Sequence, residues 1–297
     1  MKVLCALDGS KHSRWVVEAL QRWNFPQGSG LVLLHVVDVA KFRPPKGMGE
    51  AAQGAMKRAQ VMAEEIGHGL IERMKAALRS VWSVIENRVV RGHPAEAIVQ
   101  TAARQKADLI VMGSRGLTDV RAFVLGSVSR RVVMHAGCPV LLIKKRVPVL
   151  RRIVVGMDGS KHAWAGVEYL LRMPLPEAAR ITVVSVVPPL PIETSPVQIT
   201  LSEFLEQLHV PLLKKAQAVA KEAVARIQKA GFEAKAVVVH GHPSHEIVKV
   251  AEAERADLVV VGSRGLTGTT RFLMGSVSDG VIKYAPSAVL VFRRQGD

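Results

Sequence analysis

Two glycine-rich segments with the same internal spacing are the residues of this sequence best suited to bind a ligand. Each reads Gly-x-x-Gly, nine further residues and then Gly-Ser-Val-Ser, once over residues 113–129 and once over residues 262–278. Glycine lets the backbone approach a bulky anion and present unpaired N–H groups, and a helix that begins at Gly-Ser adds positive potential. The hydroxyls of Ser127 and Ser129 are further donors for phosphate oxygens. The spacing therefore predicts a cradle for a di- or triphosphate chain.

The two segments belong to a longer repeat. Residues 8–12, Asp-Gly-Ser-Lys-His, recur 150 positions later, and Arg-Gly-His-Pro at residues 91–94 is matched 149 positions later by His-Gly-His-Pro. A displacement this constant indicates two copies of one domain rather than a solenoid of short repeats. We expect domains at residues 1–146 and 151–294, joined by a short basic linker that contains Pro148.

Strands and helices alternate in each copy, as the hydrophobic pattern indicates. Ser10 or Ser13 is expected to cap the first helix, and residues 38–54 are expected to form a loop because they contain two prolines and several glycines. Apolar strands separated by helices predict a parallel sheet that is covered on both faces. In the first copy, we expect strands at residues 2–7, 31–37, 81–90, 109–112 and 140–143, and the longer helices at residues 56–78 and 95–104.

The first strand of each copy ends at an aspartate, Asp8 or Asp158, and a helix follows. Together with the glycine-rich spacing, this opening resembles the universal stress protein family, in particular tandem members of its ATP-binding branch, over nearly the whole chain. The resemblance implies two tandem doubly wound α/β domains. Each would have a five-stranded parallel sheet in the order 3-2-1-4-5, flanked by helices, with a nucleotide over its carboxyl edge. It also implies that the fifth strands, residues 140–143 and 289–292, join the two domains as an intramolecular pseudo-dimer.

The resemblance implies an ATP site in each copy, with each site residue assigned by its matching position in the family motif. The aspartates would accept hydrogen bonds from ribose hydroxyls, the backbone of Val36 or Val186 would meet the adenine edge, and Met112 or Val261 would line the adenine pocket. Ala6 and Gly156 stand where some members of the family have proline. The residues expected to bind ATP are Ala6, Asp8, Val36, Met112, Gly113, Gly116, Gly126, Ser127, Val128 and Ser129, and Gly156, Asp158, Val186, Val261, Gly262, Gly265, Gly275, Ser276, Val277 and Ser278.

The function implied by the resemblance is that of a cytoplasmic, ATP-binding regulator or sensor of the stress response, which is read by an unidentified protein partner. Mg²⁺ would be held through the phosphates, because this ion usually keeps waters and few protein ligands. A slow Mg²⁺-dependent ATPase stays open as an alternative, since the motif supplies a cradle and no positioned nucleophile. AMP, cyclic AMP or another adenosine compound, and a homodimer of the chain, stay open as well. We assign no catalytic residue.

Histidines and cysteines do not add a second site. His240, His242 and His245 are close in sequence, but only the second of them has a counterpart in the first copy, and we predict no protein-held metal there. The two cysteines, Cys5 and Cys138, are too few for a disulfide framework, which favours a reducing cytoplasmic location. No apolar stretch approaches about 18 residues, so we expect no transmembrane segment.

Charge is the unusual bulk property of the chain. Its 297 residues include 41 Lys and Arg against 25 Asp and Glu, a net charge of +16, of which +12 lies in residues 1–150. Such a surface attracts nucleic acid or other polyanions, or serves only solubility. After the second glycine-rich stretch, Arg130 and Arg131 in the first copy replace Asp279 and Gly280 in the second. We therefore expect the first copy to hold phosphate more strongly, provided that the two arginines point inward.

Overall fold

The computed structural model describes residues 1–44, 49–116, 125–189, 198–265 and 274–293. Its contacts divide the chain into two compact units. The first unit, here called domain 1, comprises Met1–Val149 with Arg293–Asp297, and the second, domain 2, comprises Leu150–Phe292. Among the helices that are described, none is both long enough and apolar enough to cross a membrane.

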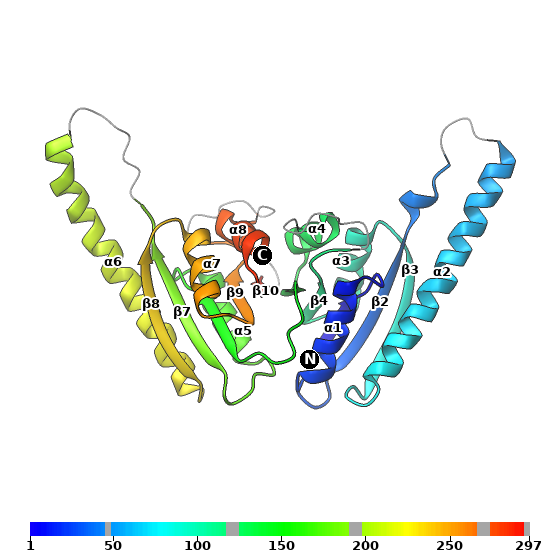
Figure 1. Cartoon of the computed structure of the whole chain (residues 1–297), viewed down its shortest axis with the longest axis horizontal. Coiled ribbons are helices and arrows are strands. Elements are labelled where there is room, and N and C mark those ends of the chain that lie inside the picture. The colour runs from blue at the N-terminus through cyan, green and yellow to red at the C-terminus, as the bar shows by residue number, and fades with distance from the viewer. Residues whose placement is uncertain (45–48, 117–124, 190–197, 266–273, 294–297) are drawn as a thin grey trace. The chain divides into compact units, whose positions relative to one another are not determined.

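Domain 1 is an α/β unit with a parallel sheet (Figure 1). Its strands lie in the order β3-β2-β1-β4-β5. Along the chain its elements are β1 (Lys2–Ala6), α1 (Lys11–Arg22), β2 (Gly30–Asp38), a 3-10 turn η1 (Val39–Phe42), α2 (Glu50–Leu78), β3 (Val84–Gly92), α3 (Pro94–Arg104), β4 (Leu109–Gly113), α4 (Ser127–His135) and β5 (Val140–Ile143).

Domain 2 repeats the arrangement, and its strands lie in the order β10-β9-β6-β7-β8, again parallel. This confirms the predicted fold, two tandem domains each with a five-stranded sheet in the order 3-2-1-4-5. The elements are β6 (Arg152–Gly156), α5 (Lys161–Leu170), β7 (Arg180–Val187), α6 (Gln198–Lys229), β8 (Glu233–His240), α7 (Pro243–Ala253), β9 (Leu258–Gly262), α8 (Ser276–Tyr284) and β10 (Ala288–Phe292).

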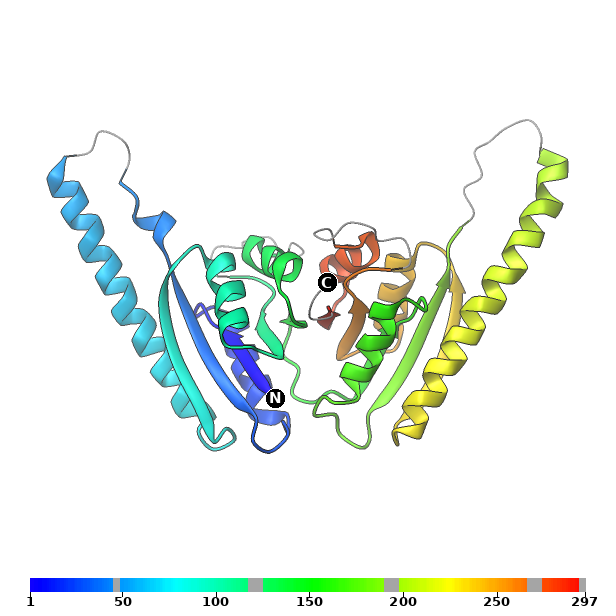
Figure 2. The same ribbon diagram turned by 180° about the vertical axis from the view of Figure 1, so that it is seen from behind.

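Helices cover both faces of each sheet. In domain 1, α1 packs against α2 and β4, whereas α3 packs against α4 and β2. Figures 1 and 2 show α1 in front of the sheet from one side and α3 in front from the other. All five residues of β4 are buried, as the unbroken apolar run Leu-Ile-Val-Met-Gly predicts for a central strand that is covered twice.

Two boundaries of domain 1 differ from the sequence prediction by three residues or more. The third strand begins at Val84 rather than at residue 81, because Trp82 is drawn into the core, where its indole Nε1 donates to the carbonyl of Leu20 at 3.0 Å. Residues 38–54 are not wholly a loop. The Asp38 carboxylate accepts a hydrogen bond from the Ala40 N–H at 3.1 Å and starts η1, and α2 begins as early as Glu50.

Candidate functional site

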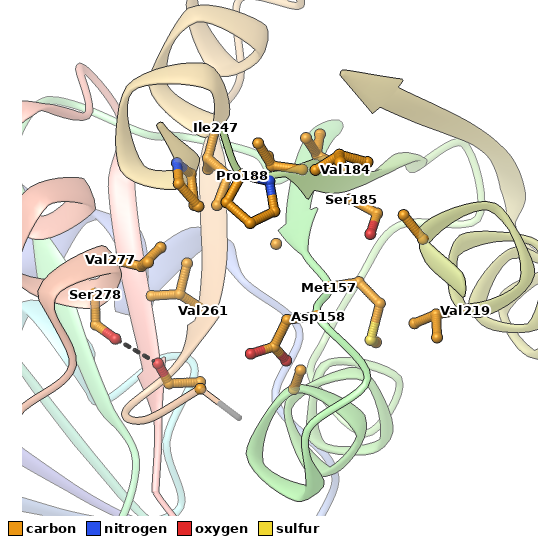
Figure 3. Close-up of a pocket in the computed structure, with 18 of the residues that line it drawn as sticks. Met157, Asp158, Val184, Ser185, Pro188, Val219, Ile247, Val261, Val277 and Ser278 are labelled. Carbon is orange, nitrogen blue, oxygen red and sulfur yellow. Dashed lines mark hydrogen bonds between the residues drawn. The ribbon is translucent and has the colours of Figure 1, made fainter. Parts of the chain in front are cut away.

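A cavity of about 310 Å³ lies in domain 2 at the carboxyl ends of β6, β7 and β9. Side chains from α6 and from the first turns of α7 and α8 complete its walls, and Figure 3 shows the Asp158 carboxylate and the Val261 and Val277 side chains around the same space. The structure brings together here most of the residues expected from the second copy. Those that line the cavity are Gly156, Asp158, Val186, Val261, Gly262, Gly265, Val277 and Ser278.

Two expected residues of the second copy lie at the start of α8, and they are not part of the cavity wall. Gly275 is the N-cap residue of α8, and Ser276 is the first residue of that helix and is exposed. Both residues lie at the N-terminus of α8, where the helix dipole and the first N–H groups within the helix favour an anion. Within each glycine-rich segment, most of the residues between Gly-x-x-Gly and Gly-Ser-Val-Ser, namely 117–124 and 266–273, lie outside the described part of the chain.

One wall of the cavity was not predicted from the sequence. Helix α6 contributes Leu212, Lys215, Ala216 and Val219, which follow the spacing of one helical face. That spacing is visible in the sequence, but it does not say whether the face packs on the sheet or lines a cleft. Met157, Ser185, Ile247 and Arg264 also line the cavity and were not expected.

The backbone after the first strand fixes the aspartate. Gly159 has φ +81°, a conformation that residues with a side chain adopt at a cost, and Ser160 caps α5 by accepting a hydrogen bond from the Ala163 N–H at 3.2 Å. Asp158 Oδ1 in turn accepts a hydrogen bond from the Ser160 N–H at 2.8 Å. The same turn in domain 1 has Gly9 at φ +81°, with Ser10 rather than Ser13 as the cap.

The glycine-rich segments are held against these aspartates. A Cβ placed on Gly265 would lie 2.8 Å from Asp158 Oδ2, and one placed on Gly116 would lie 2.8 Å from Asp8 Oδ2. The first glycine of each pair is also confined, since a Cβ on Gly262 would lie 2.9 Å from the Cβ of His162. Such distances are shorter than carbon atoms tolerate. A methyl group at these positions would therefore force the aspartate carboxylate or the start of the first helix to move, before any anion approaches.

The buried serines of the two motifs hold the glycine-rich segments in place. Ser129 Oγ donates to the Gly113 carbonyl at 3.0 Å, and Ser278 Oγ donates to the Gly262 carbonyl at 2.7 Å; both residues are 3% exposed. Each hydroxyl proton therefore holds the glycine-rich segment in this structure, and the expected contact of Ser129 with phosphate stays a prediction. Ser127 and Ser276 are exposed and keep that expected role as a prediction.

Backbone hydrogen bonds close the base of each glycine-rich segment. The Gly126 N–H donates to the Ser114 carbonyl at 2.9 Å, and the Gly275 N–H donates to the Ser263 carbonyl at 2.9 Å. The two ends of the segment are therefore fixed beside each other, which places the start of α4 or α8 next to the end of the fourth strand of its domain.

In domain 1, the expected residues occupy the matching places at the ends of β1, β2 and β4. Ala6 and Met112 are paired in the register of β1 and β4, and Val36 lies in β2. A groove of about 790 Å³ lies between η1, α3 and α4, and Ser127 and Val128 are the expected residues that line it. Arg131 faces this groove and Arg130 is exposed, so the arginines do not converge on Asp8 as a single cationic wall.

The three histidines near β8 do not assemble a metal site. His240 Nε2 lies 2.8 Å from His209 Nε2 of α6, whereas His242 is the N-cap residue of α7 and His245 lies beside Glu246. Among the described residues, no group of three or more His, Cys, Asp or Glu side chains could hold a metal ion. No local pattern indicates the His209–His240 pair, because α6 and β8 meet only in the fold.

Comparison with known proteins gives one family. The model of the universal stress protein family matches residues 1–144 and again residues 150–293. A universal stress protein of Methanocaldococcus jannaschii is 38% identical over 113 residues, which is 38% of this chain and 63% of that protein. A universal stress protein of Mycobacterium tuberculosis is 28% identical over 320 aligned residues, 98% of this chain and 97% of the relative.

The solved structures show the same fold. A universal stress protein from Archaeoglobus fulgidus superimposes with a TM-score of 0.63 and 21% sequence identity, over 99% of this chain and 98% of that one. At this identity the likeness establishes the architecture of the chain and leaves its ligand open.

Proposed function

Because the chain belongs to the universal stress protein family, we propose that it binds an adenine nucleotide, ATP foremost, at the carboxyl edge of its sheets, and acts as a nucleotide-dependent regulator of the stress response. The observation that carries the proposal is the cavity of domain 2. Residues far apart in the sequence, which the resemblance predicts to bind a nucleotide, line one space of about 310 Å³. That volume is at the lower end of the range of about 300 to 1,000 Å³ usual for small-molecule sites.

The chemistry of the walls fits a nucleoside phosphate. Val261, Val277 and Ile247 offer an apolar surface for a base, and the Asp158 carboxylate offers acceptors for ribose hydroxyls. Arg264 and Lys215 bring positive charge, and the N-terminus of α8 adds backbone donors. Bound ATP would supply a triphosphate that holds Mg²⁺ through its own oxygens, while the protein orients the nucleoside.

Binding without rapid turnover suits this arrangement. Phosphoryl transfer requires a positioned nucleophile or water, together with charge stabilisation in the transition state. The glycine-rich segment and the helix N-terminus supply only the cradle. A ligand that binds one conformation better than another shifts the population between them. We therefore propose that a partner reads the ATP-bound conformation, and that the slow ATPase is the second candidate.

Calorimetric titration of ATP, with and without Mg²⁺, tests the proposal on protein that has been freed of carried-over nucleotide by unfolding and refolding. We expect saturable binding that the isosteric variant Asp158→Asn weakens at domain 2. Glu233→Gln serves as the control, because Glu233 lies on β8 with its side chain 71% exposed and pairs with Arg180. Absence of heat in the wild-type protein, together with no thermal shift, would refute nucleotide binding.

A further inference from the structure

The cavity of domain 2 includes a compartment between β7 and α6. Ser185 near the end of β7, Met157 after β6, and Ala216 and Val219 on α6 form its walls. Figure 3 shows the Ser185 side chain between Met157 and the α6 ribbon. Ser185 and Ala216 are small residues, so the size of the compartment depends on the side chains at these two positions.

In domain 1, the corresponding positions hold His35 and Gly67, and an imidazole occupies the space. His35 Nδ1 lies 2.8 Å from the Leu7 carbonyl oxygen, and Leu7 is the counterpart of Met157. A Cβ placed on Gly67 would lie 2.6 Å from His35 Cδ2 and 3.3 Å from Val89 Cγ1. Gly67 is therefore the residue that lets the imidazole fit under α2, and the pair forms a plug.

A second wall position differs in the same direction. Leu70 of α2 stands where α6 has Val219, and both face the glycine that follows the aspartate, with closest approaches of 3.6 Å to a Cβ on Gly9 and 3.2 Å to a Cβ on Gly159. Leucine carries one more methylene than valine into this region. The exposed Ile66 of domain 1 replaces Lys215, so domain 1 also lacks the cation that lines the cavity of domain 2.

The two aspartates differ in their hydrogen bonds as well. Asp8 Oδ1 accepts hydrogen bonds from the Ser10 N–H at 2.9 Å and from Ser13 Oγ at 2.6 Å. Asp158 Oδ1 accepts one from the Ser160 N–H at 2.8 Å, and Ala163 replaces the second serine. An oxygen that already accepts two protein donors has less remaining capacity for a ribose hydroxyl.

We infer that the two nucleotide sites of this chain are not equivalent: domain 2 binds the nucleoside first and more tightly, and the His35–Gly67 plug weakens the site of domain 1. The inference rests on the proposed function and specifies which copy carries it. This order of affinity is the reverse of the one expected from Arg130 and Arg131. The filled compartment takes space from the base and ribose, whereas the charge of exposed arginines is screened by solvent and salt. His35 is thus a specificity-determining residue of domain 1.

Exchange of the plug between domains tests the inference in the full chain by ATP calorimetry. Gly116→Ala and Gly265→Ala assign each binding event to a domain. We expect the tighter event to vanish in Gly265→Ala and to persist in Gly116→Ala. Ser185→His with Ala216→Gly, which places the plug in domain 2, should weaken the tighter event by at least about tenfold.

The reciprocal exchange guards against misfolding. His35→Ser with Gly67→Ala should strengthen binding at domain 1 by about tenfold, and a gain of affinity does not arise from loss of structure. Loss of the tighter event in Gly116→Ala, or unchanged affinities in both exchanges, would overturn the inference while ATP binding itself stands. Absence of ATP binding in the wild-type protein would instead overturn the proposed function.

Discussion

Asp158 and Gly265 lie against each other although 107 residues separate them, with Asp158 Oδ2 only 2.8 Å from the place of a Cβ on Gly265. The same relationship links Asp8 and Gly116 in domain 1. The carboxylate at the end of the first strand and the second glycine of the loop after the fourth strand therefore form one unit. A substituent on the glycine displaces the aspartate, so the two residues cannot vary independently.

We expect Gly265→Ala to lower the affinity of domain 2 for ATP by at least about tenfold, because the new methyl group pushes the Asp158 carboxylate or the loop out of position. ATP-dependent thermal shift is the readout. Gly137→Ala is the matched control, since a Cβ at Gly137 meets no atom within 4 Å. Equal shifts in the two variants would show that contact between the glycine and the aspartate does not matter for binding.

Ser278→Ala is expected to destabilise domain 2 by about 1 to 3 kcal/mol, because it leaves the Gly262 carbonyl without its donor in a half-buried place. Ser276→Ala, at an exposed position in the same helical turn, should change stability by less than about 0.5 kcal/mol. Urea unfolding of the two variants measures both values. Equal losses of stability would contradict the assignment of Ser278 as the residue that holds the loop.

Both cysteine thiols should resist modification in the native protein. Burial raises the pKa of Cys138 to about 12, with a further contribution from the Asp108 charge, and burial also raises the pKa of Cys5 far above its ordinary value. The thiolate is the reactive form. We expect Ellman's reagent at pH 8 to label neither thiol until denaturant is added. Rapid labelling of one equivalent in the native protein would contradict the burial of that thiol.

Lys144, which follows β5, gives a pH dependence of stability. Burial lowers its pKa from 10.5 to about 8, and the charge of Arg115 acts in the same direction. Below pH 8 the folded protein holds a charged lysine at a cost, and this cost is relieved as pH rises from about 8 to about 10.5. We expect the wild-type protein to gain stability over that window relative to Lys144→Met. A constant difference between the two would contradict the lowered pKa.

The apolar runs predicted a parallel α/β fold, whereas the sheet order and the individual site residues came from the resemblance to the universal stress protein family. Apolar runs such as residues 109–113 favour a buried central strand, and the repeated spacing of glycines predicts a binding edge in each copy. The wall formed by α6 could not be found in this way. The apolar face of α6 is evident in the sequence. Whether Ala216 and Val219 pack on the sheet or line a cleft depends on the size of the side chains from β7.

The roles of single side chains were less predictable than their positions. Ser129 and Ser278 occur where the motif places them, yet each donates to a glycine carbonyl sixteen residues earlier in the chain. His35 and Gly67 belong to different elements, and no local pattern connects an imidazole on β2 with the glycine on α2 that accommodates it. Such pairings are made by tertiary packing, which propensity and spacing do not encode.

Photolabelling with an azidoadenine analogue of ATP, followed by peptide mapping, tests the central claim most directly, because it reports where the base lies. We expect label on the cavity walls of domain 2, at residues 156–158 and 184–188, at Ile247, Val261 and Val277, and on the face of α6 that includes Ala216. We expect excess ATP to suppress this label. Absence of label from these walls, or label on them that excess ATP leaves unchanged, would contradict the claim that this cavity is a nucleotide site.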